Sequence, residues 1–174
     1  MNNRYGAATK PKYHDNIERH KRPASLQKLD HDSASILEEY LRSARCGLLI
    51  PRITHQTIVM LWVIDESEDC YFCIEEMYKS DSEITVFPRL DGVGYPQGFE
   101  KLGHPSLVGA EKARIAGEII WSGGAGNAGS WVISNKSGRY GIRPDISEQN
   151  LINAKALFGS FGIELDHYFI PHQG

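Results

Sequence analysis

Apolar residues recur at helical spacing between residues 35 and 46. The apolar positions there fall on one side of a helix: Ile36, Leu37, Tyr40, Leu41 and Ala44. Ser35 and Glu38 have the spacing of a capping box, in which each side chain binds a free backbone N–H at the helix start. Gly47 can adopt the left-handed conformation that ends a helix. The pattern therefore predicts a helix over 35–46.

A second amphipathic segment lies later in the chain. Its apolar side chains share one side at helical spacing: Leu151, Ala154, Leu157, Phe158 and Phe161. Ser147 suits the N-cap, because its hydroxyl can accept a hydrogen bond from the first turn, and Gly162 suits the end. We therefore expect a helix over 148–161, followed by a strand over 165–170.

The chain between these two helices is rich in β-branched and aromatic residues. The run 57–64 is apolar without alternation, which predicts a strand covered on both faces. Further strands are predicted at 70–74, 84–87, 115–121 and 130–134. Residues 88–104 are rich in Gly and Pro, which predicts a long loop. Strands clustered between two helices favour an α+β fold, in which a mainly antiparallel sheet is flanked by a few helices.

Charge divides the chain into two parts. The protein has 174 residues and a formal net charge of −3, which argues against a nucleic-acid binder that is basic overall. Residues 1–30 carry seven Lys and Arg against three acids, with two prolines and few apolar residues. That composition predicts a basic extended arm or linker, which could contact a partner. Residues 31–174 are then one α+β domain.

The residues 64–83 form an acidic stretch. They contain eight acids and one lysine: Asp65, Glu66, Glu68, Asp69, Glu75, Glu76, Asp81 and Glu83, with Lys79. Such a stretch either meets a basic partner or forms solvated turns and strand edges that resist aggregation.

Several familiar signals are missing or incomplete. No apolar run approaches the roughly 20 residues that cross a bilayer, and the start lacks the apolar region of a cleavable leader. Three cysteines are too few for a disulfide scaffold, which favours a reduced, cytosol-like compartment. Cys70 and Cys73 are expected to be buried thiols, not half of a metal site. The glycine-rich residues 124–129 match a dinucleotide-binding fingerprint by letter, but a strand follows them instead of a helix, which predicts a hairpin loop.

The densest group of chemically capable side chains lies at 103–143. An imidazole, a carboxylate and a phenol fall there on neighbouring short segments: His104, Glu118 and Tyr140. Adjacent strands lie about 5 Å apart, so the three could line one cleft. A buried Glu118 must find a partner, because an unpaired buried carboxylate is costly. It is therefore either a structural hydrogen-bond anchor or a functional acid.

The order of these motifs resembles a tail domain of bacterial polymorphic toxins, the Rhs-type and contact-delivered effectors. The resemblance covers residues 104–162 and rests on His-x-Ser-Leu, then Ala-Gly-Glu-Ile, then Asn-x-Ser-Gly-x-Tyr. In that pattern His precedes the tyrosine and a basic residue with Pro follows it, whereas Arg139 and Gly141 stand here. The resemblance implies a protein made in a bacterial cytoplasm and delivered into a target cell without a cleavable signal peptide. It also implies a macromolecular target there, a cognate immunity protein and no membrane partner.

Many delivered toxins are similar to NAD-dependent ADP-ribosyltransferases, which implies NAD as a substrate and no metal. One branch of that class binds the adenosine ribose through a His and stacks the nicotinamide on a Tyr. Those roles would fall to His104, with Ser106 beside it, and to Tyr140. Glu164 or Asp166 would supply the late acid, because a fixed carboxylate stabilises an oxocarbenium-like transition state.

Two alternatives stay open. A papain-like thiol deamidase or protease would use Cys46 as nucleophile, His104 as base and Glu118 to orient the base. Cys46 is expected at the C-terminal end of its helix, where the helix dipole raises a thiol pKa and so weighs against this role. A non-enzymatic immunity or adaptor protein would instead bind its partner through the acidic residues 64–83.

Overall fold

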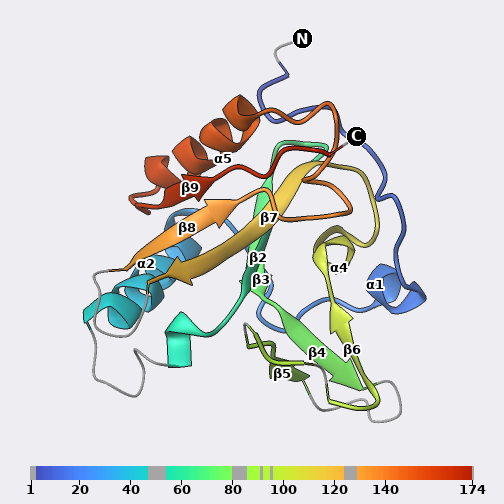
Figure 1. Ribbon diagram of the computed structural model, residues 1–174, viewed down its shortest axis with the longest axis horizontal. Helices are drawn as coiled ribbons and strands as arrows, with labels where there is room; N and C mark the ends of the chain where they lie inside the picture. The colour runs from blue at the N-terminus through green and yellow to red at the C-terminus, as the bar shows by residue number, and fades with distance from the viewer. Residues whose placement is uncertain are drawn as a thin grey trace.

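The chain folds into two sheets, with helices packed against them (Figure 1). The computed structural model describes residues 3–46, 54–79, 86–90, 92–94, 96–123 and 129–173. The helices whose bounds lie within these ranges include α1 (Asn16–His20), α2 (His31–Cys46), α4 (His104–Val108) and α5 (Glu148–Ser160), and residues 54–56 are also helical. The strands are β1 (Gln27–Lys28), β2 (Met60–Asp65), β3 (Cys70–Ile74), β4 (Glu76–Lys79), β5 (Val86–Pro88), β6 (Phe99–Leu102), β7 (Ala113–Ser122), β8 (Ser130–Ser134) and β9 (Asp166–Tyr168).

The larger sheet has the order β1-β3-β2-β7-β8-β9 among the described strands. Neighbouring strands in this sheet are antiparallel, except for β8 and β9, which are parallel to each other. The smaller sheet, β5-β4-β6, is antiparallel throughout its described residues. The structure is one compact domain, so the predicted α+β fold with a mainly antiparallel sheet is confirmed.

Strand β2 lies inside the larger sheet and is covered on both faces. Met60, Trp62 and Ile64 belong to the core that α2 and α5 close. Leu61 and Val63 point to the other face, into a second core that Leu107 of α4 and Tyr140 complete. A strand buried on both faces needs apolar residues at every position, so the prediction made from the run 57–64 is confirmed for residues 60–64, whereas residues 57–59 precede the strand.

Helix α2 begins four residues before the predicted start. Asp30 and Ser33 exchange hydrogen bonds: the Asp30 carboxylate accepts from the Ser33 N–H at 2.9 Å, and the Ser33 hydroxyl oxygen accepts from the Asp30 N–H at 3.0 Å. This pair caps the helix, and Ser35 instead donates to the carbonyl of Asp32 inside the first turn. The predicted capping box of Ser35 and Glu38 is therefore wrong. The predicted end at Gly47 lies outside the described residues.

Helix α5 begins as predicted, with Ser147 as N-cap and Asn150 completing a capping box. Gly162 follows the helix with a φ of 84°, a left-handed conformation that glycine adopts without strain. Leu151, Ala154 and Phe158 are buried against the sheet. The helix therefore presents one apolar face, although it ends at Ser160, one residue before the predicted boundary.

The predicted long loop at 88–104 contains regular structure. Strand β6 and the first residue of α4 lie in it, and β4 was not predicted at all. Strand β4 begins at Glu76, a buried acid whose carboxylate accepts hydrogen bonds from the backbone N–H groups of Ala24 and Ser25. A glutamate at a buried position hides the apolar pattern by which a strand is predicted. Residues 84–85 of a predicted strand and residues 124–128 of the predicted hairpin loop over 124–129 lie outside the described residues.

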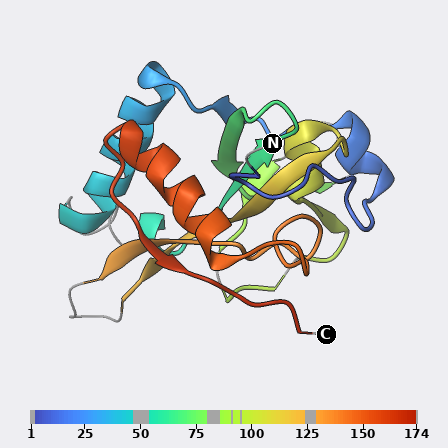
Figure 2. The same cartoon turned by 90° about the horizontal axis from the view of Figure 1, so that it is seen from above.

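The first thirty residues, expected to be an extended arm, pack against the domain. Tyr5 is buried in the main core, and Thr9 pairs with Ala113 at the start of β7. The Arg143 guanidinium donates to the carbonyl of Ala7 at 2.8 Å. Both ribbon views show this blue segment crossing the molecule to α1, which lies beside α4 (Figures 1 and 2). Over the described ranges, no helix has the length and apolar composition needed to cross a membrane.

Candidate functional site

His104 is the first residue of α4 and is 8% exposed. Its Nε2 lies 2.9 Å from the carbonyl oxygen of Gly117 in β7, so this nitrogen carries the proton and donates it. Burial lowers the pKa of His104 to about 4, and the imidazole is therefore neutral at pH 7. Ser106, also buried, donates its hydroxyl to the carbonyl of Gly103 at 2.7 Å. His104 thus joins α4 to β7, and Ser106 closes the first turn of α4 on its N-cap residue.

Glu118 lies in the middle of β7, opposite Leu61 of β2 and Ser134 of β8. Its carboxylate is buried, and the Lys136 ammonium lies 3.0 Å from Oε2. Burial raises the pKa of Glu118, and the hydrogen bond and charge of Lys136 act in the opposite direction. The alternation of β7 puts Glu118 on the same face as Ala116, the face that α4 covers.

Tyr140 is fully buried in the second core. Its hydroxyl donates to the carbonyl oxygen of Glu111 at 2.7 Å, and burial raises its pKa. His104, Glu118 and Tyr140 therefore do lie on one face of the sheet, as their spacing suggested. Each has its own partner, however, and the partner is a backbone carbonyl for two of the three.

The other motif residues in this region also hold the backbone together. The Asn135 amide donates to the carbonyls of Gly141 and Ile170, and its oxygen accepts the Ile170 N–H at 2.7 Å. A Cβ on Gly117 would lie 1.7 Å from the carbonyl oxygen of Ser134, so only glycine fits there. The motifs that carry the toxin-domain resemblance thus join β7, β8 and the last residues of the described chain.

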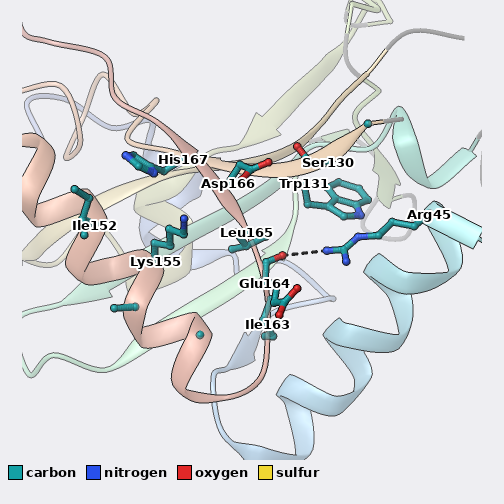
Figure 3. A pocket seen from close by; sticks show the side chains of 13 residues that line it. Arg45, Ser130, Trp131, Ile152, Lys155, Ile163, Glu164, Leu165, Asp166 and His167 are labelled. Carbon is teal, nitrogen blue, oxygen red and sulfur yellow. Dashed lines mark hydrogen bonds between the residues drawn. The ribbon is translucent and has the colours of Figure 1, made fainter. Parts of the chain in front are cut away.

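Glu164 lies elsewhere, in the segment that leads from α5 to β9. It is exposed and lines a cleft of about 670 Å³ between α5 and the end of α2 (Figure 3). Trp131 of β8 lines the same cleft, and it belongs to the core on the α2 and α5 face of the sheet. The structure therefore does not bring Glu164 together with His104 or Tyr140, which lie beyond the sheet.

This cleft, which we call the α2–α5 cleft, gathers charged side chains from three elements. Arg45 reaches from α2 and donates to the carbonyl of Glu164 at 3.0 Å, and Lys155 projects from α5 on the opposite side (Figure 3). Asp166 and His167 follow on β9, where His167 lies 3.4 Å from a carboxylate oxygen of Glu148.

The charges of Arg45, Lys155, Glu164 and Asp166 are not paired with one another. Among the described residues, neither cation has a carboxylate within 4.0 Å, and neither carboxylate accepts a hydrogen bond or ion pair. A surface cleft with such cations on two walls can hold an anionic ligand, because each cation can form a charge-assisted hydrogen bond without breaking an ion pair.

The thiol arrangement is not assembled. Cys46 is the exposed last residue of α2, and its Sγ lies 3.2 Å from the carbonyl oxygen of Arg42. Helix α2 packs on the opposite face of the sheet from His104 and Glu118. Cys70 and Cys73 are buried free thiols, as predicted. Within the described chain, no three His, Cys, Asp or Glu side chains come together in a way that could hold a metal ion.

The described acids of the stretch 64–83 are engaged within the chain. Three of them pair with basic side chains in the turn region, Glu66 with Lys112, Glu68 with Arg114 and Asp69 with Lys28. Asp65 accepts from two backbone N–H groups of its own turn, and Glu75 pairs with Arg89 at 2.6 Å. These contacts leave little uncompensated negative charge on the described part of the stretch.

Sequence reasoning did not select Arg45 or Lys155 for the site. Arg45 lies in the last turn of α2, and Lys155 is a half-buried residue within α5. No local pattern connects them with Glu164, which is 119 positions from Arg45. No protein-family model, curated protein or solved structure matches this chain.

Proposed function

We propose that this chain is an effector domain that binds NAD in the α2–α5 cleft and transfers ADP-ribose to a macromolecule of the recipient cell. The observation that carries the proposal is the unpaired carboxylate of Glu164, which lines the cleft together with the unpaired cations Arg45 and Lys155. The resemblance of residues 104–162 to contact-delivered toxin domains supports the choice of reaction.

The cleft suits the size and charge of a dinucleotide. Its volume of about 670 Å³ lies within the range of about 300–1,000 Å³ found for small-molecule sites. The diphosphate of NAD carries two negative charges, and Arg45 and Lys155 offer one positive charge from each wall. Apolar side chains of Ile152 and Leu165 also line the cleft and could cover the rings.

Glu164 supplies the acid that the reaction needs. The bond between the ribose anomeric carbon and the nicotinamide nitrogen breaks, and its electron pair leaves with nicotinamide, which becomes neutral. The positive charge that develops on the sugar is stabilised by a nearby carboxylate. The acceptor atom then forms a bond to the anomeric carbon and loses its proton to the Glu164 carboxylate.

His104, Ser106 and Tyr140 have a different role in this proposal from the one that the resemblance implies. All three are buried and donate to backbone carbonyls, so they support the sheet and α4 instead of contacting NAD. Their replacement should therefore reduce activity only as far as it reduces the folded fraction.

The test uses the full chain, a cell lysate and NAD labelled in its adenylate part. Label should appear on a macromolecule, and Glu164→Gln should lower the rate by 100-fold or more, because the carboxamide cannot take a proton. Glu39→Gln is the matched control, because Glu39 is an exposed glutamate of α2 that does not line the cleft. Absence of transfer by the folded wild type, or equal rates for Glu164→Gln and Glu39→Gln, would contradict the proposal.

A further inference from the structure

The residues 10–22, on and around α1, form a basic surface on which one of the two acids, Glu18, is buried. The segment contains five Lys and Arg: Lys10, Lys12, Arg19, Lys21 and Arg22. Of its two acids, Glu18 is fully buried and accepts the N–H of Gly103 at 3.0 Å and a hydrogen bond from Arg139, whereas the Asp15 side chain is 64% exposed. Asp15 lies 3.7 Å from the Arg139 guanidinium. We call residues 10–22 the α1 surface.

Three cations of this surface form no ion pair within the described residues. Lys12, Arg19 and Arg22 are exposed, and none of them has a carboxylate within 4.0 Å among the described residues. The Arg22 guanidinium donates to the backbone carbonyl of Arg19 at 3.3 Å, which holds the Arg22 side chain against α1. Arg19 also lies 3.3 Å from the Nε2 of His14, next to Tyr13 in sequence.

Tyr13 is a fixed, exposed aromatic ring within this basic surface. It is 62% exposed, and the Arg139 guanidinium carbon lies 4.7 Å from the ring centroid. Arg139 is itself buried and is held by Glu18, so the guanidinium forms a rigid support beneath the ring. One face of Tyr13 is therefore supported, and its exposure leaves the rest of the ring open to a stacking partner.

We infer that the α1 surface binds single-stranded nucleic acid, with a base stacked on Tyr13 and phosphates on Lys12, Arg19 and Arg22. Proteins that bind single strands without sequence preference combine a basic track with aromatic rings on which bases stack. An acidic protein partner fits less well, because protein interfaces usually have an apolar core. Of the large apolar side chains that are exposed in the described residues, Tyr13 alone lies on this surface. The net charge of the whole chain is negative, so it does not indicate this local basic surface.

The measurement is fluorescence anisotropy of labelled 20-nucleotide oligo(U) and oligo(dT) with the full chain, at two salt concentrations. Tyr13→Ala should weaken binding about 10-fold, and Tyr13→Trp should restore it. Tyr168→Ala is the matched control, because Tyr168 is equally exposed, at 64%, but lies on β9. Arg19→Glu should weaken binding and reduce the salt dependence, whereas Arg42→Glu, an exposed arginine of α2, should do neither.

Two results would overturn the inference. One is equal binding by Tyr13→Ala and Tyr168→Ala while circular dichroism shows that both are folded. The other is binding to polyglutamate, or to vesicles containing phosphatidylserine, as tightly as to oligo(U), since either would show that the surface selects charge alone or a different class of partner. This surface lies on α1 and not at the α2–α5 cleft, so loss of oligonucleotide binding and loss of NAD-dependent transfer are separate outcomes.

Discussion

Two polar regions lie on opposite faces of the larger sheet, and they differ in what their polar groups bind. On the α4 face, His104 and Tyr140 are buried and donate to the carbonyls of Gly117 and Glu111. In the α2–α5 cleft, Lys155 and Glu164 are accessible and have no charged partner among the described residues. Groups that are already bonded inside a fold contribute to its stability, whereas convergent unpaired groups at a surface are available to a ligand. The following predictions test this distinction.

The largest effect is expected at Gly117 on the α4 face. A Cβ at this position would lie 1.7 Å from the carbonyl oxygen of Ser134, which is backbone and cannot move without shifting β8. Gly117→Ala should therefore lower the free energy of unfolding by about 3 kcal/mol or more, measured by urea denaturation. Gly138→Ala is the control, because a Cβ there meets nothing within 4 Å. Similar losses in the two variants would show that the β7–β8 contact tolerates displacement.

The next effect is a pH dependence of stability that comes from His104. Burial lowers its pKa from the ordinary value of 6.5 to about 4, so the unfolded chain binds the proton more tightly than the folded one. Stability should be full above pH 6.5 and should fall as the pH drops toward 4, by up to about 3 kcal/mol. The measurement is urea denaturation between pH 7 and pH 4. His104→Gln keeps every carboxylate and removes the imidazole, so it should be less stable at pH 7 but lose less on acidification. Equal pH slopes for the two proteins would mean that His104 does not titrate in this range.

Parts of the fold could be predicted from the sequence wherever the pattern is local. Strand β2 and helix α5 were predicted because their patterns are local: an unbroken apolar run, and helical spacing behind Ser147. The start of α2 was predicted wrongly because two capping pairs compete there, and the pair of Asp30 and Ser33 also ties the helix to β1 through the carbonyl of Lys28. Strand β4 was missed because it begins with a charged residue, Glu76. Its burial depends on backbone N–H donors from residues 24–25, which are distant in the sequence.

The candidate site was harder to predict than the fold. The sequence marked His104, Glu118 and Tyr140 as chemically capable, and the structure does place them on one face. The sequence could not show that His104 and Tyr140 already donate to the backbone carbonyls of Gly117 and Glu111, because those partners come from other segments. The α2–α5 cleft likewise depends on long-range packing. Its cations lie on two helices whose approach is set by the core of Leu41, Trp131 and Phe158, not by any local motif.

A smaller effect is expected from the cations of the cleft. Arg45→Ala and Lys155→Ala should each weaken NAD binding about 10-fold, because each removes one charge-assisted hydrogen bond to the diphosphate. Neither should lower the free energy of unfolding by more than about 1 kcal/mol, since neither cation has an ion-pair partner in the described chain. Titration calorimetry with NAD measures the first quantity, and urea denaturation measures the second. Arg42→Ala, one turn earlier on α2, is the control for loss of an arginine. If Arg42→Ala weakens binding as much as Arg45→Ala, the cations act through overall charge and not through the cleft.

The smallest effect concerns the ion pair of Glu118 and Lys136 on the α4 face. The Lys136 side chain is 51% exposed, so water screens the pair, and Lys136→Met should cost less than about 1 kcal/mol of stability. The pKa of Glu118 is a more sensitive measure. Burial raises it and Lys136 opposes that rise, so removal of the ammonium should raise the pKa further. The carboxyl carbon shift of Glu118, followed by NMR during a pH titration, should show a higher midpoint in Lys136→Met than in the wild type. An unchanged midpoint would mean that the lysine remains in solvent and that Glu118 is buried without a charged partner, which would make it a stronger candidate for a functional acid than its present contacts suggest.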